Sequence, residues 1–251
     1  MSTPAPSAVL TRIRVVLSQT SHPGNIGSAA RALKTMGLAQ LVLVAPRLFP
    51  AWEATSLAAG ADDILTQARV VETLDEALAG CAWSVAATAR PRELVAAVMD
   101  ARESAAQLVE EAGRDDNCIV AVVFGNETSG LSNEDARRCN AMAHIPANPA
   151  YSSLNLAAAV QVFAYELRMA VDRGIPGPVG PQDVPATQDE VEGLLRHCES
   201  ALTEIGFLKP DNPGRLMPRL QKLFGRARLE KEEVNILRGI LNAAVGRRRQ
   251  G

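Results

Sequence analysis

Polar side chains that could take part in chemistry gather in three short stretches of this sequence. The first stretch contains Asn25, Ser28 and Arg31, which recur along one side of a helix at spacings of about one turn. A polar strip that ends in a cation could bind a phosphate or an alcohol. The alternative is an ordinary surface arginine, although the neighbouring positions carry conspicuously small side chains.

The second stretch is FGNETSGLS, residues 124–132, which carries Glu127 between two glycines. Gly125 and Gly130 allow a close approach of the backbone to a ligand or to another chain segment. A carboxylate in such a loop could orient a cation or an amine of a ligand. The alternative is a loop acid that is simply solvated.

The third stretch is the loop that leads into a long apolar helix, and it contains Ser152, Ser153 and Asn155. Ser152 or Ser153 is a natural N-cap, because a serine oxygen can accept a hydrogen bond from an unpaired backbone N–H group. The simplest interpretation is that the serines cap the helix and the asparagine lies on its first turn. Three polar loops of this kind in one open sheet indicate a shared site.

Alternating strand and helix patterns surround these loops. Strands are predicted at 12–19, 41–46, 83–89, 118–125 and 141–146, with a weak one at 64–71, and helices at about 26–36, 51–62, 74–79, 100–112 and 154–172. A capping box at 132–135 also predicts the start of a short helix. This alternation predicts an α/β fold with a doubly wound, Rossmann-like parallel sheet. Ligands bind such sheets beyond the carboxyl ends of the strands, so the loops at 18–31, 86–92, 125–131 and 145–155 should converge.

The chain is expected to divide into four parts. Residues 1–11 are interpreted as a disordered tail, 12–172 as the sheet domain, 173–187 as a linker rich in proline and glycine, and 188–251 as a small helical extension. From residue 206 onward there are eleven Lys and Arg against four Asp and Glu. Such a block could contact an anionic partner, nucleic acid above all, or it could be a solvated helical face.

Composition excludes several classes of protein. No run of about 18 uncharged apolar residues occurs, so a membrane span is not expected. The four cysteines are scattered without a C-x-x-C pair, which favours buried free thiols in a reducing compartment and a cytoplasmic location. The three histidines show no spacing typical of metal ligands, so no metal site is expected.

A nicotinamide-dependent oxidoreductase is one alternative, because Gly24-Asn25-Ile26-Gly27 follows a strand and opens a helix. The complete G-x-G-x-x-G fingerprint is missing, and no carboxylate follows the second strand before Glu53. Both absences disfavour this alternative.

The three stretches together resemble a known family. N-x-x-x-x-x-R over Asn25–Arg31, then FGNE-x-x-GL, then YSSLNL-x-A are similar, in this order, to the three motifs of the SpoU-type 2′-O-ribose methyltransferases of the SPOUT superfamily. The resemblance covers residues 12–172. It extends beyond the linker, through GRLMPRLQKLFGRARLE and NILRGIL, to bacterial enzymes of this family that methylate nucleotide 32 of tRNA.

The resemblance implies a trefoil-knotted α/β domain that forms a homodimer and binds S-adenosyl-L-methionine. The implied activity is methylation of a ribose 2′-hydroxyl in tRNA, at cytidine or uridine 32 of the anticodon loop. Ribosomal RNA is the alternative substrate. A dimer that binds RNA without catalysis is the alternative class.

Site residues also follow from the resemblance. The implied catalytic residue is Arg31, in the company of Asn25, Glu127, Ser153 and Asn155. The implied cofactor-binding residues are Ala87, Thr88, Ala89, Gly125, Ile145, Ser152, Ser153 and Leu154. Arg31 is the family's candidate for handling the 2′-hydroxyl proton, but arginine stays protonated in proteins, so we favour phosphate positioning and charge stabilisation.

Overall fold

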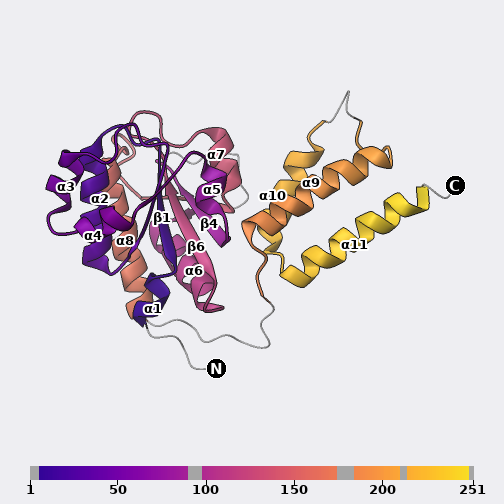
Figure 1. Ribbon diagram of the computed structural model, residues 1–251, viewed down its shortest axis with the longest axis horizontal. Coiled ribbons are helices and arrows are strands. Elements are labelled where there is room, and N and C mark those ends of the chain that lie inside the picture. The colour runs from indigo at the N-terminus through magenta and orange to yellow at the C-terminus, as the bar shows by residue number, and fades with distance from the viewer. Residues whose placement is uncertain (1–5, 90–97, 174–183, 210–213, 249–251) are drawn as a thin grey trace. The chain divides into compact units, whose positions relative to one another are not determined.

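The computed structural model describes residues 6–89, 98–173, 184–209 and 214–248. The chain divides into two compact units, Met1–Val179 and Gly180–Gly251 (Figure 1). The predicted loop at 86–92 and the predicted linker at 173–187 lie partly outside the described residues. Each unit has its own core and is described by itself.

The first unit is built on a sheet of seven parallel strands in the order β3-β2-β1-β6-β4-β7-β5. The strands are β1 (Ile13–Ser18), β2 (Gln40–Val44), β3 (Arg69–Val71), β4 (Cys81–Ala87), β5 (Val98–Asp100), β6 (Ile119–Phe124) and β7 (Ala141–His144). All pairings are parallel, which confirms the predicted α/β class.

Helices cover both faces of this sheet (Figure 1). They are α1 (Pro6–Leu10), α2 (Pro23–Met36), α3 (Trp52–Ala58), α4 (Asp62–Gln67), α5 (Leu74–Leu78), α6 (Ala101–Gly113), α7 (Asn133–Arg138) and α8 (Leu156–Asp172). Side chains of β1 alternate between the faces, as a strand requires. Val15 and Leu17 pack in the cluster that includes α2, α6 and α8, whereas Val16 packs in the cluster of α5 and α7.

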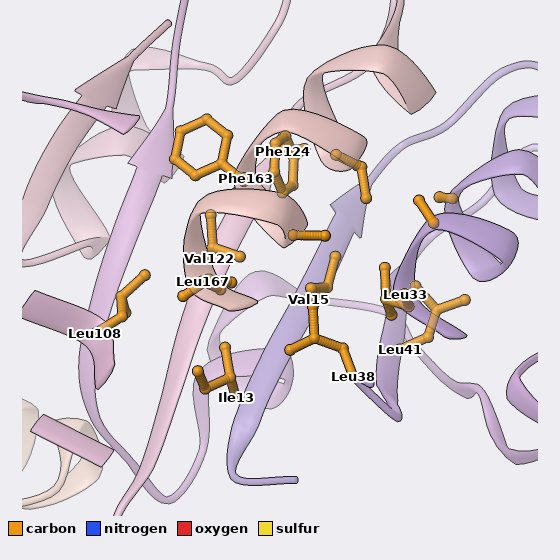
Figure 2. Close-up of a cluster of buried hydrophobic side chains, with 14 of the residues drawn as sticks. Ile13, Val15, Leu33, Leu38, Leu41, Leu108, Val122, Phe124, Phe163 and Leu167 are labelled. Atoms are coloured by element: carbon orange, nitrogen blue, oxygen red, sulfur yellow. The ribbon is translucent and has the colours of Figure 1, made fainter. Parts of the chain in front are cut away.

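The larger core cluster joins the central strands to α8 (Figure 2). Phe124 at the end of β6 meets Phe163 of α8 edge to face, with ring centroids 5.3 Å apart and an interplanar angle of 89°. This is a favourable aromatic geometry. Leu167 lies one turn further along α8 and is fully buried, so the helix is fixed along the sheet by its apolar stripe.

The predicted helix at about 26–36 is confirmed as α2, which starts earlier than predicted. It begins at Pro23 rather than near residue 26, because proline is well suited to the first turn of a helix. It ends at Met36 and is followed by Gly37, whose φ of 81° is the left-handed conformation that glycine favours after the end of a helix. Gly27 lies where α3 crosses, and a Cβ there would lie 2.0 Å from the Ala54 carbonyl oxygen. The two helices can therefore pack this closely only with glycine at 27.

Two sequence-based expectations are wrong in this unit. The weak strand at 64–71 is the end of α4 followed by only three residues of β3, because Ile64 and Leu65 are buried on a helix. The disordered tail over 1–11 is wrong for residues 6–11, since α1 buries Val9 and Leu10 completely in the large cluster. Residues 1–5 lie outside the described residues. The three-residue strand β5 was not predicted.

The second unit contains three described helices, α9 (Gln188–Glu204), α10 (Leu216–Ala227) and α11 (Lys231–Arg248). Thr187 and Glu190 form a capping box at the start of α9. A small core forms around Leu194, Cys198 and Val234. The bounds of the other three predicted parts of the chain stay predictions.

The structure also shows the state of the cysteines and whether the described residues could hold a metal ion or cross a membrane. All four cysteines are free and buried, as predicted. No group of three or more His, Cys, Asp or Glu residues in the described ranges is placed to hold a metal ion. Within the same ranges, no helix has the length and apolar character needed to cross a membrane.

Candidate functional site

A cavity of about 400 Å³ lies where the loops after β4, β6 and β7 meet. Four segments line it, and they include every residue predicted to bind the cofactor: Ala87, Thr88, Ala89, Gly125, Ile145, Ser152, Ser153 and Leu154. Phe124 and Phe163 line it as well, so the aromatic pair of the core also borders the cavity. The structure thus brings these predicted residues together at the carboxyl edge of the sheet.

The loop after β6 is held in one conformation by its own backbone. A Cβ at Gly125 would lie 2.1 Å from backbone atoms of Gly130 and Leu131, so the two ends of this loop approach as only glycine permits. The Asn126 side-chain oxygen accepts hydrogen bonds from the backbone N–H groups of Thr128 (3.0 Å) and Ser129 (2.8 Å). This Asx turn presents Glu127 to the loop after β1.

Glu127 is the centre of a hydrogen-bond network that joins the loops after β1 and β6. Its Oε2 accepts from the backbone N–H of Ser21 at 3.0 Å and from the Ser21 hydroxyl at 2.7 Å. Its Oε1 accepts from the Asn25 side-chain amide at 2.7 Å and from the backbone N–H of His22 at 3.2 Å. His22 is the N-cap of α2 and makes no side-chain cap of its own. Glu127 therefore supplies the negative charge that stabilises the start of α2.

The protonation state of Glu127 follows from these contacts. Burial alone would raise its pKa, but the hydrogen bonds from Ser21 and Asn25 outweigh burial and lower the pKa from 4.5 to about 2. The side chain is a carboxylate near neutral pH. A group with so low a pKa is a weak base, so the geometry fits Glu127 as a positioning residue rather than as a proton acceptor.

Asn155 extends the network to α8. Its side-chain amide donates to the Asn25 oxygen at 3.0 Å, while its own oxygen accepts from the backbone N–H groups of Ala157 (2.9 Å) and Ala158 (3.3 Å). Asn155 is therefore the N-cap of α8, and the expectation that Ser152 or Ser153 caps this helix is wrong. The physical reason is that the chain enters the helix two residues later, which leaves both serines in the lining of the cavity.

The other two predicted catalytic residues are placed differently. Ser153 lines the cavity, as does Glu127. Arg31 lies on α2 beyond Asn25, is exposed, and its guanidinium makes no hydrogen bond or ion pair among the described residues. The structure thus unites Asn25, Glu127 and Asn155, and it leaves Arg31 free to meet a partner from solution.

Sequence reasoning missed Ser21, which donates two of the four hydrogen bonds to Glu127. The position of Ser21 in the sequence could have indicated its role, because it lies between a buried strand and a proline at the first turn of a helix. Backbone donors at such helix starts are unpaired and attract carboxylates.

Comparisons with known proteins bear on this site. Residues 12–165 match the SpoU rRNA methylase family, and residues 189–251 match the family described as the C-terminal domain of the tRNA methyltransferase TrmJ. A tRNA (cytidine/uridine/adenosine-2′-O-)-methyltransferase, TrmJ of Pseudomonas aeruginosa, is 50% identical over 93% of this chain and 93% of its own length. A tRNA (cytidine/uridine-2′-O-)-methyltransferase, TrmJ of Escherichia coli K12, is 47% identical over 97% of this chain and 98% of its own.

Solved structures are similar as well. The crystal structure of TrmJ from Z. mobilis ZM4 superposes with a TM-score of 0.78 at 34% identity, covering 92% of this chain and 97% of that one. A probable methylase family protein from Haemophilus influenzae Rd KW20 has a TM-score of 0.62 at 42% identity, covering 96% and 99%. Both likenesses extend over both units of the chain.

Replacing Glu127 by Gln should destabilise the protein. The amide nitrogen of Gln is itself a donor, and it would face N–H or O–H donors that bond a carboxylate oxygen in the wild type. An unpaired donor costs about 1–3 kcal/mol, and each kcal/mol lowers Tm by about 2–4 °C in a chain of this size. Thermal melting followed by circular dichroism measures this.

The pH dependence provides a second readout for the same variant. The folded-state pKa of Glu127 lies below its ordinary value of 4.5. The stability that the Glu127 carboxylate contributes to the folded protein is therefore fully present above pH 4.5 and is lost as the pH falls towards about 2. The Tm difference between wild type and E127Q should shrink over this window. Glu110→Gln, an exposed acid of α6, is the control and should change Tm little. Equal melting of wild type and E127Q at pH 7 would contradict the network.

Proposed function

The chain belongs to the SpoU rRNA methylase family, and we propose that it methylates ribose 2′-hydroxyl groups of tRNA with S-adenosyl-L-methionine as the methyl donor. One structural observation carries this proposal: the cavity and the Asn25–Glu127–Asn155 network are contiguous, because Glu127 belongs to both. The 2′-O-methyltransferases that are about half identical over nearly the whole chain support the choice of tRNA.

The cavity fits the methyl donor. Its volume of about 400 Å³ lies in the range of sites for nucleotide-sized ligands. Its lining combines small residues with exposed backbone, such as Ala87 and Gly125, and the apolar surface of Phe124 and Leu131. Backbone groups can pair with a purine and a ribose, while the apolar side chains contact the ring faces. When bound, S-adenosyl-L-methionine would supply an electrophilic methyl group attached to a cationic sulfur.

The residues of the network would act mainly by positioning. Glu127 orients the Asn25 amide, whose oxygen in turn orients Asn155 at the start of α8. Ser153 lies at the cavity wall, where its hydroxyl can contact either the methyl donor or the ribose. A nucleophile that is held in line gains most of its advantage from this fixed geometry.

Arg31 would hold the RNA. Its guanidinium is exposed and unpaired in the described structure, and it carries donors that suit a phosphate in bidentate geometry. A cation beside the 2′-hydroxyl also stabilises the negative charge that develops as the proton leaves. We assign Arg31 to phosphate positioning and charge stabilisation.

The finer features of the proposal rest on the family resemblance. We include a trefoil knot, a homodimer, a cytoplasmic location and nucleotide 32, cytidine or uridine, as the target. Relatives that are tRNA (cytidine/uridine-2′-O-)-methyltransferases support cytidine and uridine as target nucleosides.

The second unit would bind tRNA through helix α10. Four exposed cations lie along it at spacings of four, three and four residues: Arg215, Arg219, Lys222 and Arg226. This spacing places them on one side of the helix. None of them forms an ion pair within the described part of the chain. An unpaired row of cations is well suited to a phosphate backbone.

The proposed function is tested by incubating the protein with labelled S-adenosyl-L-methionine and unmodified tRNA, followed by mapping of the methylated nucleotide. A label on a 2′-oxygen in the anticodon loop is the expected result. Binding of the methyl donor without transfer to any tRNA would move the substrate to ribosomal RNA. Failure to bind the methyl donor would refute the proposal.

Arg31→Ala should abolish turnover while the affinity for S-adenosyl-L-methionine stays within about twofold, because Arg31 lies outside the lining of the cavity. Arg31→Lys should also lose most activity, since an ammonium group lacks the bidentate geometry. Single-turnover rates and calorimetric titration of the methyl donor measure the two effects. Lost affinity for the methyl donor in either variant would count against this role.

Replacing all four α10 cations by Gln should weaken tRNA binding and flatten its dependence on salt. Each lost phosphate contact lowers the slope of log K against log salt by about 0.7 to 0.9, so the slope should fall by up to about three. The control is Arg196→Gln on α9, because Arg196 is already paired with Glu192 at 2.7 Å. An unchanged salt slope in the α10 variant would refute the role of this helix.

A further inference from the structure

Four exposed residues follow β2, on segments that contact the loop after β1 and the start of α2. They are Arg47 and Leu48, from the loop after β2, and Trp52 and Leu57 of α3, and together they are called the flanking surface. The exposed fractions of its apolar members are 54% for Leu48, 76% for Trp52 and 49% for Leu57. The chain contains only two tryptophans, and the other, Trp83, is 5% exposed. Nothing in the network or the cavity uses this surface.

This flanking surface is fixed to the segments that carry the network. The backbone N–H of Arg47 donates to the Thr20 carbonyl at 3.0 Å, one residue before Ser21. Leu57 packs closely against Gly24, because a Cβ added at Gly24 would lie 2.8 Å from a methyl carbon of Leu57. Helices α2 and α3 lie side by side at the edge of the unit (Figure 1). The position of Trp52 is therefore set relative to the first turn of α2, which carries Asn25.

The chemistry of these residues suits an RNA partner. Arg47 is exposed, and its guanidinium has no ion-pair partner in the described ranges. Glu53 and Ser56 are exposed between the apolar residues, and glutamate and serine are depleted at subunit interfaces. An exposed indole and an exposed guanidinium that lie five residues apart in the chain suit an unpaired base and its phosphate, because bases stack on aromatic rings while cations hold the backbone.

We infer that Trp52 and Arg47 form a subsite for an unpaired nucleotide that flanks the methylated ribose in the tRNA loop. The base stacks on the indole of Trp52, and Arg47 contacts the adjoining phosphate. Stacking of this kind tolerates every base, because each base has an aromatic face. The subsite therefore contributes affinity to all tRNA substrates and does not select among them. This inference rests on the proposed function.

The test measures tRNA binding, methyl-donor binding and turnover for Trp52→Ala, Trp52→Phe and Arg47→Ala in the full chain. Trp52→Ala should raise the Kd for tRNA about tenfold or more, within the range that base–aromatic stacking supplies. Trp52→Phe should stay within about threefold of wild type, since a flat ring remains. Turnover at saturating tRNA and the affinity for S-adenosyl-L-methionine should stay unchanged in both. Val70→Ala, which shortens another exposed apolar residue at the sheet edge, is the control.

Intrinsic fluorescence gives a readout that a structural role would not move. Addition of unmodified tRNA should quench the emission of wild type through Trp52, and this quenching should be absent in Trp52→Phe, which keeps only the buried Trp83. Arg47→Ala should lower the salt slope of binding by about 0.7 to 0.9.

Two outcomes would overturn the inference. One is tRNA affinity in Trp52→Ala equal to that of wild type and Val70→Ala. The other is a fall in molar mass by light scattering in Trp52→Ala, which would assign the surface to a second copy of the chain. Failure of the proposed function is recognised separately, because wild type itself would then transfer no methyl group to tRNA.

Discussion

The carboxylate of Glu127 is the interaction on which the arrangement of the site depends. Its two oxygens accept four hydrogen bonds, all from residues between β1 and the first turn of α2. Because Glu127 follows β6, this single side chain joins loops that are about a hundred residues apart in the sequence. Asn25 passes the connection on to Asn155, and through it to α8. Helix α8 in turn lines the cavity and packs on β6 through Phe163 and Phe124. The network and the core therefore support one another.

The order of the strands explains why these loops meet. Strands β1 and β6 are neighbours, so the loop that carries Ser21 emerges beside the loop that carries Glu127. Strands β4 and β7 are neighbours as well, which places Ala87–Ala89 beside the loop after β7. Because all strands run parallel, the four loops open at one edge of the sheet. The cavity and the network are thus consequences of one topology, and the functional proposal depends on their being a single site.

Much of this could be predicted from local patterns in the sequence. Apolar runs bounded by glycine and polar residues gave the buried parallel strands, and the rule for carboxyl-edge loops predicted their convergence. The failures have physical causes. Asn155, Ser152 and Ser153 are all good helix caps, so composition alone cannot choose among them, and the choice of Asn155 depends on its contact with Asn25. Val9 and Leu10 form too short an apolar segment to indicate a helix, and only tertiary packing makes them part of the core. The pairing of Ser21 with Glu127 is a long-range contact that no local pattern encodes.

Hydrogen–deuterium exchange tests the central claim, that Glu127 couples the start of α2 to the start of α8. The measurement compares the unliganded wild type with Glu127→Ala, in peptides that cover residues 19–25 and 155–160. Our account predicts that the amides of Ser21 and His22, which bond Glu127, lose protection together with those of Ala157 and Ala158, which bond Asn155. Loss of protection confined to residues 19–25, with the start of α8 unchanged, would contradict it.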